Sequence, residues 1–101
     1  MTVSMRIIKD TLTTEENRLV HAMQLLGDST RYKMFKLLNS NQDLCVSEMA
    51  NRLGISPSAV SQHFKSFEML GLVSKERTGQ RICYVFTDDN LVQELRQLTK
   101  V

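Results

Sequence analysis

The sequence is poor in the residues that indicate a secreted, membrane-spanning or fibrous protein. It has no tryptophan, one proline, four glycines and two cysteines among 101 residues. Two cysteines are too few for a disulfide framework, and in a reducing cytosol both are expected to be thiols. No apolar run approaches the ~18 residues that span a bilayer, and the first ten residues lack the layout of a signal peptide. We therefore expect a cytoplasmic protein without a membrane partner.

Length and composition suit one globular domain. Apolar residues make up 42% and charged residues 24% of the chain, which is ordinary for such domains. The net charge is only +2, but residues 52–81 contain five basic and two acidic residues, whereas the rest contains eight basic and nine acidic residues. A local excess of positive charge is what phosphate contacts require.

Helical spacing of apolar residues begins near Thr13. Thr13 and Glu16 have the spacing of a capping box, and Gly27 is expected to end this first helix. Residues 1–12 either extend it or form an arm. We therefore divide the chain into that segment and a domain over residues 13–101.

Three further helices are expected before residue 71. Asp28 caps the second, which the polar run 39–43 ends. Ser47 is expected to cap a short third helix, and Gly54 to end it. Ser56 is the expected N-cap of the fourth, which runs from Pro57 to about Leu70. A short helix, a tight turn and a longer helix make a helix-turn-helix.

The last third of the chain changes period. Residues 75–77 and 81–86 are typical of two strands joined by a turn at Gly79. Thr87 or Asp88 is expected to cap a final helix with an apolar face. The pattern predicts a mainly α fold with a small β-hairpin, a winged helix-turn-helix of about five helices and a two-stranded wing.

The polar face of the fourth helix and the tip of the hairpin are the predicted DNA contacts. The first part of a recognition helix reaches base edges in the major groove, where a glutamine amide pairs with adenine. The helix offers Ser58, Ser61, Gln62 and Lys65, and the hairpin tip offers Arg77, Gln80 and Arg81. Arginine suits phosphate or a narrow minor groove. The alternative is that these are solvated surface residues.

Several segments resemble the ArsR/SmtB family of repressors. Residues 26–31 resemble its "LGDPTR" motif, residues 56–64 its "SQSAVSQHL" recognition helix, and residues 70–73 and 77–84 its "GLV…R.GR..YY" wing. The similarity covers residues 14–98. It implies a homodimer joined by the first and last helices, which binds operator DNA and is released by an effector. Ser56 and His63 lie in the matching recognition motif and join the predicted DNA contacts.

The expected dimer interface is apolar. The final helix has little core of its own chain left to cover, so we expect its apolar stripe to pair with the partner's copy and with the first helix. The predicted interface residues are Leu19, Met23, Leu91, Leu95 and Leu98.

The effector site departs from the family pattern. The family's thiolate segment resembles "ELCVCDL", but here Cys45 is followed by Ser47, and a hydroxyl is a poor ligand for soft metals. The final helix begins at residues 88–90 without the family's histidine, so neither family metal site is intact. Cys45 precedes a helix N-terminus, which lowers a thiol pKa. Three interpretations stay open. Cys45 is a thiol switch, alone or with Cys83; or it joins a rearranged metal site that uses Cys83 or acidic residues from either subunit; or it does neither. Cys83 itself is expected to pack in the wing.

The sequence therefore predicts a sequence-specific DNA-binding regulator, a homodimeric repressor on an inverted-repeat operator. A winged helix that binds only proteins is the alternative, and Lys65 with the hairpin arginines argues against it. An enzyme is not expected, because no catalytic serine, histidine and acid motif and no glycine-rich phosphate loop occurs.

Overall fold

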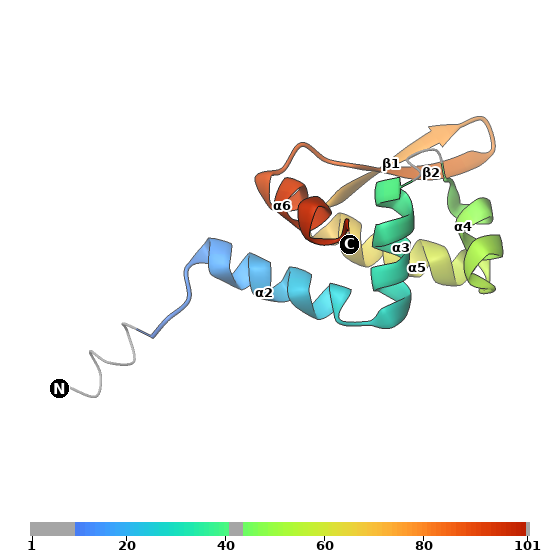
Figure 1. The fold of residues 1–101 in the computed structure, drawn as a ribbon. Helices are drawn as coiled ribbons and strands as arrows, with labels where there is room; N and C mark the ends of the chain where they lie inside the picture. Colours follow the sequence, from blue (N-terminus) through green and yellow to red (C-terminus); the bar gives the residue numbers. More distant parts are fainter. Residues whose placement is uncertain (1–9, 41–43, 101) are drawn as a thin grey trace.

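A computed structural model describes residues 10–40 and 44–100, and this part of the chain folds into five helices and a two-stranded antiparallel hairpin (Figure 1). The elements are α2 (Thr14–Leu26), α3 (Ser29–Ser40), α4 (Val46–Leu53), α5 (Pro57–Met69), β1 (Val73–Thr78), β2 (Arg81–Phe86) and α6 (Asn90–Leu98). The predicted winged helix-turn-helix is confirmed, with α4 and α5 as the helix-turn-helix and the hairpin as the wing. Most of the predicted arm over residues 1–12 lies outside the described residues.

Two of the predicted helix starts are confirmed in atomic detail. The Thr13 hydroxyl accepts a hydrogen bond from the Glu16 N–H at 3.0 Å, and the Glu16 carboxylate accepts one from the Thr13 N–H at 2.8 Å. At the start of α5, the Ser56 hydroxyl accepts from the Ala59 N–H at 3.1 Å. These bonds satisfy backbone donors that a helix leaves unpaired at its first turn.

Two other predicted caps are wrong. Cys45, rather than Ser47, is the N-cap of α4, and the Glu48 carboxylate accepts a hydrogen bond from the Cys45 N–H at 2.9 Å. Asp89, rather than Thr87 or Asp88, caps α6 by accepting from the Leu91 N–H at 2.9 Å. Thr87 is not available because its hydroxyl donates to the Gly71 carbonyl at 2.8 Å.

The helix α3 runs further into the polar run than predicted, to Ser40. A tertiary contact explains the difference. The Asn39 amide donates to the Arg96 carbonyl at 2.9 Å, and its oxygen accepts from the Arg96 Nε at 2.8 Å. A residue with low helix propensity is thereby held in helical geometry by α6.

The core lies where α3, α5 and the hairpin meet. Phe35 of α3 contacts the rings of Phe67 and Phe86, with centroid distances of 6.1 and 4.9 Å. The most deeply buried large side chains are Phe35, Phe64, Phe67, Met34, Leu38, Met49, Leu72, Val60 and Val92. In Figure 1 the helix α2 extends from this body towards the N-terminus, whereas the tip of the hairpin lies at the other end of the molecule.

The hairpin register gives the wing two distinct faces. Val73 lies opposite Phe86, Lys75 opposite Tyr84 and Thr78 opposite Arg81. Because directly opposed residues share a face, the inner face carries Val73, Lys75, Arg77, Ile82, Tyr84 and Phe86. The outer face carries Ser74, Glu76, Thr78, Arg81, Cys83 and Val85.

Among residues 10–40 and 44–100, no helix is both long enough and apolar enough to cross a membrane.

Candidate DNA-binding site

A groove of about 510 Å³ runs between α5 and the inner face of the wing. It collects four of the predicted DNA contacts from α5, namely Ser58, Ser61, Gln62 and Lys65. From the wing it collects Lys75, Ile82 and Tyr84. Hydroxyls, an amide and two cations thus line one concave surface together with the Glu68 carboxylate. Hydroxyls, amides and cations are the groups that bind base edges and phosphates.

Aromatic packing fixes the wing against α5. The rings of Phe64 and Tyr84 stack with centroids 4.4 Å apart and planes inclined by 15°. Both side chains are buried, and this burial raises the pKa of the Tyr84 hydroxyl. The stack places the polar face of α5 and the inner face of the wing on the two sides of the same groove.

Lys75 is a groove residue that the predicted set did not contain. It lies directly opposite Tyr84 in the hairpin and shares the inner face with Arg77. The signal for it was present, because Lys75 and Arg77 are alternate residues of the predicted strand over residues 75–77 and therefore share a face. The observed β1 begins at Val73.

Five of the nine predicted contacts do not line the groove, and two of these, Ser56 and His63, come from the N-cap and the body of α5. The Ser56 hydroxyl is used in the cap of α5. His63 lies close enough to Asp28 to influence its carboxyl. The hydrogen bond from the Arg31 N–H is the main cause that lowers the pKa of Asp28, and His63 lowers it further. Direct DNA contacts by these two residues stay predictions.

The two wing arginines have different surroundings. Arg77 lies on the inner face and is exposed. Arg81 lies on the outer face, where its Nη2 is 2.8 Å from the Glu48 Oε1. The Cys45 N–H and then Arg81 lower the pKa of the Glu48 carboxyl, so it carries a negative charge at neutral pH. Gln80 lies exposed in the turn between them.

The two cysteines form a disulfide, so the expectation of two free thiols is wrong. The physical reason is that Cys45 and Cys83 lie directly opposite each other in an antiparallel β-bridge between the start of α4 and β2. Cys83 therefore does more than pack in the wing. The pairing was among the interpretations that the sequence left open, but the sequence alone could not select it, because the two residues lie 38 positions apart.

The residues of the family's thiolate segment do not fit a metal here. The sulfur of Cys45 is bonded to Cys83 and a serine replaces the second thiolate. In the part of the chain that the structure describes, no three histidine, cysteine, aspartate or glutamate side chains come together in a way that holds a metal ion.

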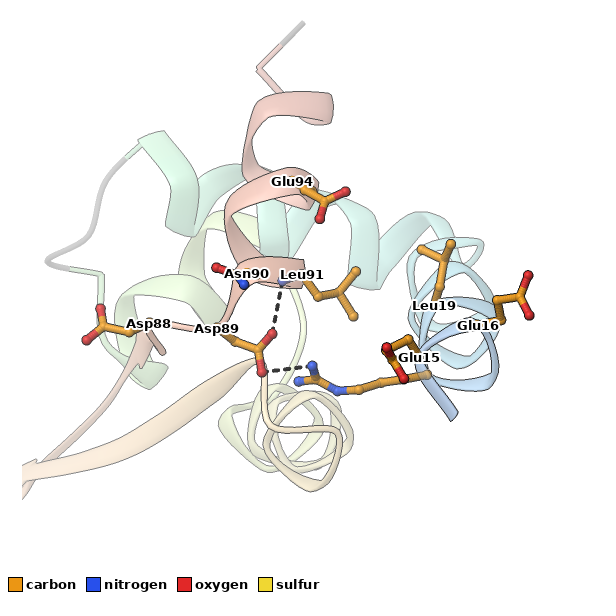
Figure 2. Close-up of a pocket in the computed structure, with 9 residues that line it drawn as sticks. Glu15, Glu16, Leu19, Asp88, Asp89, Asn90, Leu91 and Glu94 are labelled. Carbon is orange, nitrogen blue, oxygen red and sulfur yellow. Dashed lines mark hydrogen bonds and ion pairs between the residues drawn. The ribbon is translucent and has the colours of Figure 1, made fainter. Parts of the chain in front are cut away.

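A second concave surface, between α2 and the start of α6, is acidic (Figure 2). At its base Arg18 pairs with Asp89 at 2.8 Å and donates two hydrogen bonds to the Leu70 carbonyl at 2.8 and 3.2 Å. The Arg18 hydrogen bond and then the Leu91 N–H lower the pKa of the Asp89 carboxyl. Arg18 thereby joins α2, the end of α5 and the cap of α6, a role that the sequence did not indicate.

Three of the five predicted dimer residues are exposed apolar side chains. Leu19 is 41% exposed, Met23 61% and Leu98 72%. Leu91 is half-buried. Leu95 is only 4% exposed and packs in the core of its own chain. The expectation that its own chain leaves Leu95 uncovered is wrong, because α6 turns Val92 and Leu95 inward together.

A protein-family model described as "Bacterial regulatory protein, arsR family" matches residues 28–75, which run from the start of α3 into β1. Over these residues the chain matches the ArsR/SmtB family. It is a DNA-binding transcriptional regulator, and the proteins of this ArsR family are not enzymes. One similar solved structure, a possible ArsR-family regulator of Mycobacterium bovis, is described as a homodimeric winged helix-turn-helix DNA-binding domain.

Individual ArsR-family proteins support the assignment. The chain is 26% identical to a cadmium resistance regulatory protein CadC homolog of Staphylococcus aureus, over 87% of this chain and 73% of that protein. It is 31% identical to CadC of Listeria innocua, over 60% of this chain and about half (51%) of that protein's length. Among solved structures, HlyU of Vibrio cholerae is 25% identical with a TM-score of 0.75, over 86% of this chain and 92% of that chain.

Proposed function

We propose that the chain is a homodimeric transcriptional repressor that acts in the cytoplasm on an inverted-repeat operator. The observation that carries this proposal is the groove between α5 and the wing, which Gln62, Lys65 and Lys75 line. It lies within residues 52–81, the part of the sequence with an excess of basic residues. A symmetric dimer presents two such grooves, and it matches half-sites about one helical turn apart.

The residues of the groove divide into readers and positioners. Gln62, Ser58 and Ser61 lie in the first two turns of α5, the part of a recognition helix that reaches base edges. Lys65, Lys75 and the wing arginines supply cations for phosphates, which fix the register without reading sequence. We propose that His63 and Ser56 make secondary contacts with the DNA.

The dimer is proposed to form through α2 and α6. Leu19, Val20 and Met23 make an exposed apolar strip on α2, and Leu98 adds an exposed apolar side chain at the end of α6. A strip of this kind is costly in water and is typical of a protein interface. A second copy of the chain covers it in the proposed repressor.

The proposal extends to the class of effector, and the bond between the two cysteines supports it. Cys45 and Cys83 are bonded to each other. A thiol-reactive effector therefore fits the site better than a metal ion. The relative CadC is named for cadmium resistance. Metal salts are therefore included as a comparison in any test of effectors.

The test is selection of binding sites from a pool of randomised DNA duplexes, followed by affinity measurements by fluorescence anisotropy. We expect enrichment of an inverted repeat, bound by two chains, with an affinity that falls steeply with salt. Enrichment of an isolated half-site bound by one chain contradicts the homodimer. Absence of any enrichment, with weak binding that is equal for all duplexes, favours the winged helix that binds only proteins.

A further inference from the structure

We propose that the Cys45–Cys83 disulfide is a redox-controlled clasp that fixes the wing on the helix-turn-helix, and that closing it raises the affinity for operator DNA. The inference rests on the proposed function and adds its regulation. It starts from two observations, the connection that the disulfide makes and the face of the wing on which it lies.

The clasp joins the two parts of the DNA-binding surface. Cys45 is the N-cap of α4, the first helix of the helix-turn-helix, and Cys83 lies in the middle of β2. Besides the disulfide, α4 holds the wing through the ion pair between Glu48 and Arg81. That pair is about half exposed on both sides, and exposed ion pairs contribute little. A backbone β-bridge at the same two residues also joins the start of α4 to β2. The disulfide is covalent and is therefore stronger than the exposed ion pair.

The clasp lies on the outer face and leaves the groove open. Cys83 and Arg81 share the outer face, whereas Lys75 and Arg77 share the inner face that looks onto α5. The stack of Phe64 on Tyr84 holds the inner face. With the clasp closed, the wing is held from both faces and its inner cations stay directed at the groove.

The compartment makes the disulfide responsive. A transcriptional regulator works where the DNA is, and there glutathione and thioredoxin keep most protein thiols reduced. Disulfides that form in such a compartment are transient and sense oxidants. A disulfide that stays oxidised in a secreted protein is therefore reversibly reduced in this one.

The chemistry is a two-electron exchange. A dithiol reductant attacks through one thiolate, and we expect it to attack the sulfur of Cys83, because residue Cys83 is half-buried whereas residue Cys45 is buried. The S–S bond breaks, Cys45 leaves as a thiolate and takes up a proton, and the second thiol of the reductant displaces Cys83. The reductant ends as a disulfide. In the reverse direction a peroxide takes two electrons and two protons from the thiols and becomes water and an alcohol, or two waters.

Closing the clasp affects DNA binding through pre-organisation. A wing that is held at one angle loses less conformational entropy when it docks on the phosphates. A rigid binding surface avoids the free-energy cost of ordering flexible elements on binding. We expect the reduced protein to bind the selected duplex about fivefold more weakly than the oxidised protein, on the order of the ordering cost of one or two side chains.

The experiment compares oxidised and reduced wild type with a Cys45→Ser, Cys83→Ser double variant. Site selection is done in parallel with both redox forms, affinities are measured on the selected duplex with and without dithiothreitol, and maleimide labelling with intact mass counts the thiols. We expect two thiols to appear on reduction, the affinity to fall and to recover after peroxide treatment. The double variant is expected to bind like the reduced protein and to ignore both reagents.

Three outcomes overturn the clasp. Oxidised and reduced forms with affinities within twofold show that the wing does not depend on it. Tighter binding by the reduced form reverses the proposed direction. Loss of the helical circular dichroism signal on reduction shows that the bond is a structural staple. If neither redox form enriches any duplex, the proposed function fails, which is a separate result because the thiol count still reports the disulfide.

Discussion

The helices α2 and α5 each bury one face and expose the other, and the exposed faces differ in chemistry. The exposed face of α5 carries Ser58, Gln62 and Lys65, whereas that of α2 carries Leu19, Val20 and Met23. Polar side chains at a groove are stable in water and ready to exchange water for base edges and phosphates. Exposed apolar side chains are stabilised when another surface removes them from water. The same small core therefore supports one surface suited to DNA and another suited to a second copy of the chain.

The largest expected effect is on the apolar face. Met23→Glu puts two carboxylates, one from each copy, into the proposed interface, and burying unpaired charges costs several kcal/mol. We expect the dimer dissociation constant, measured by sedimentation equilibrium, to rise at least about a hundredfold. Gln24→Glu is the matched control, because it adds the same charge to an exposed position on the same helix. A Met23→Glu protein that sediments as a wild-type dimer places the interface elsewhere.

The polar face is tested with Gln62→Ala. Loss of the amide is expected to weaken binding to the best duplex by ~1–3 kcal/mol and to leave binding to unrelated duplexes almost unchanged. The ratio of the two affinities is the measurement. Lys65→Ala is the comparison, because removal of a phosphate contact lowers both affinities together. Equal loss on all duplexes from both variants contradicts the division into readers and positioners.

The link between the two faces is Arg18, which reaches from α2 to the end of α5 and to α6. Arg18→Met removes its hydrogen bonds to the Leu70 carbonyl and its pairing with Asp89. We expect the free energy of unfolding in urea to fall by on the order of 1–2 kcal/mol. Arg52→Met, an exposed arginine on α4, is expected to have a much smaller effect. Equal effects from the two variants mean that the junction contributes no more than a surface charge.

The two faces of the wing give a smaller contrast. Arg77→Ala removes a cation from the inner face, and we expect the slope of log affinity against log salt to fall by about one. Arg81→Ala is expected to change the slope less, because Arg81 lies on the outer face beside Glu48. Anisotropy titrations from low to moderate salt measure both slopes. A larger change for Arg81 than for Arg77 places the outer face against the DNA.

Local signals were sufficient for most of the fold but not for contacts between distant elements. The caps at Thr13 and Ser56 use side chains within three residues of the bonds they make, so spacing alone predicted them. The cap at Asp89 was missed because a long-range bond to Gly71 occupies Thr87. The four α5 residues of the groove followed from helical periodicity, whereas Lys75 could be assigned only once the face of the hairpin that packs on α5 was known.

The largest errors concern residues whose surroundings come from other elements. Leu95 has the spacing of an interface residue, but its burial depends on how α6 turns against α3 and the rest of the core. The pairing of Cys45 with Cys83 depends on a β-bridge between segments 38 residues apart. Neither composition nor periodicity carries that information.

The smallest expected effect is a pH dependence at the junction of the two faces. The hydrogen bond from Arg18, and then that from the Leu91 N–H, hold the pKa of Asp89 below its ordinary value of 3.8. A carboxyl whose pKa is lowered by folding stabilises the native state above its unfolded pKa, and this stability is lost as the pH falls through the folded pKa.

Asp89→Asn keeps a residue that caps helices and removes only the charge. We therefore expect its urea midpoint to lie below that of the wild type at pH 7, and the gap to narrow below about pH 4. The neighbouring exposed Asp88→Asn is the matched control, and it should show no such convergence. A gap for Asp89→Asn that is the same at pH 3 and pH 7 means that the Arg18 ion pair does not stabilise the fold.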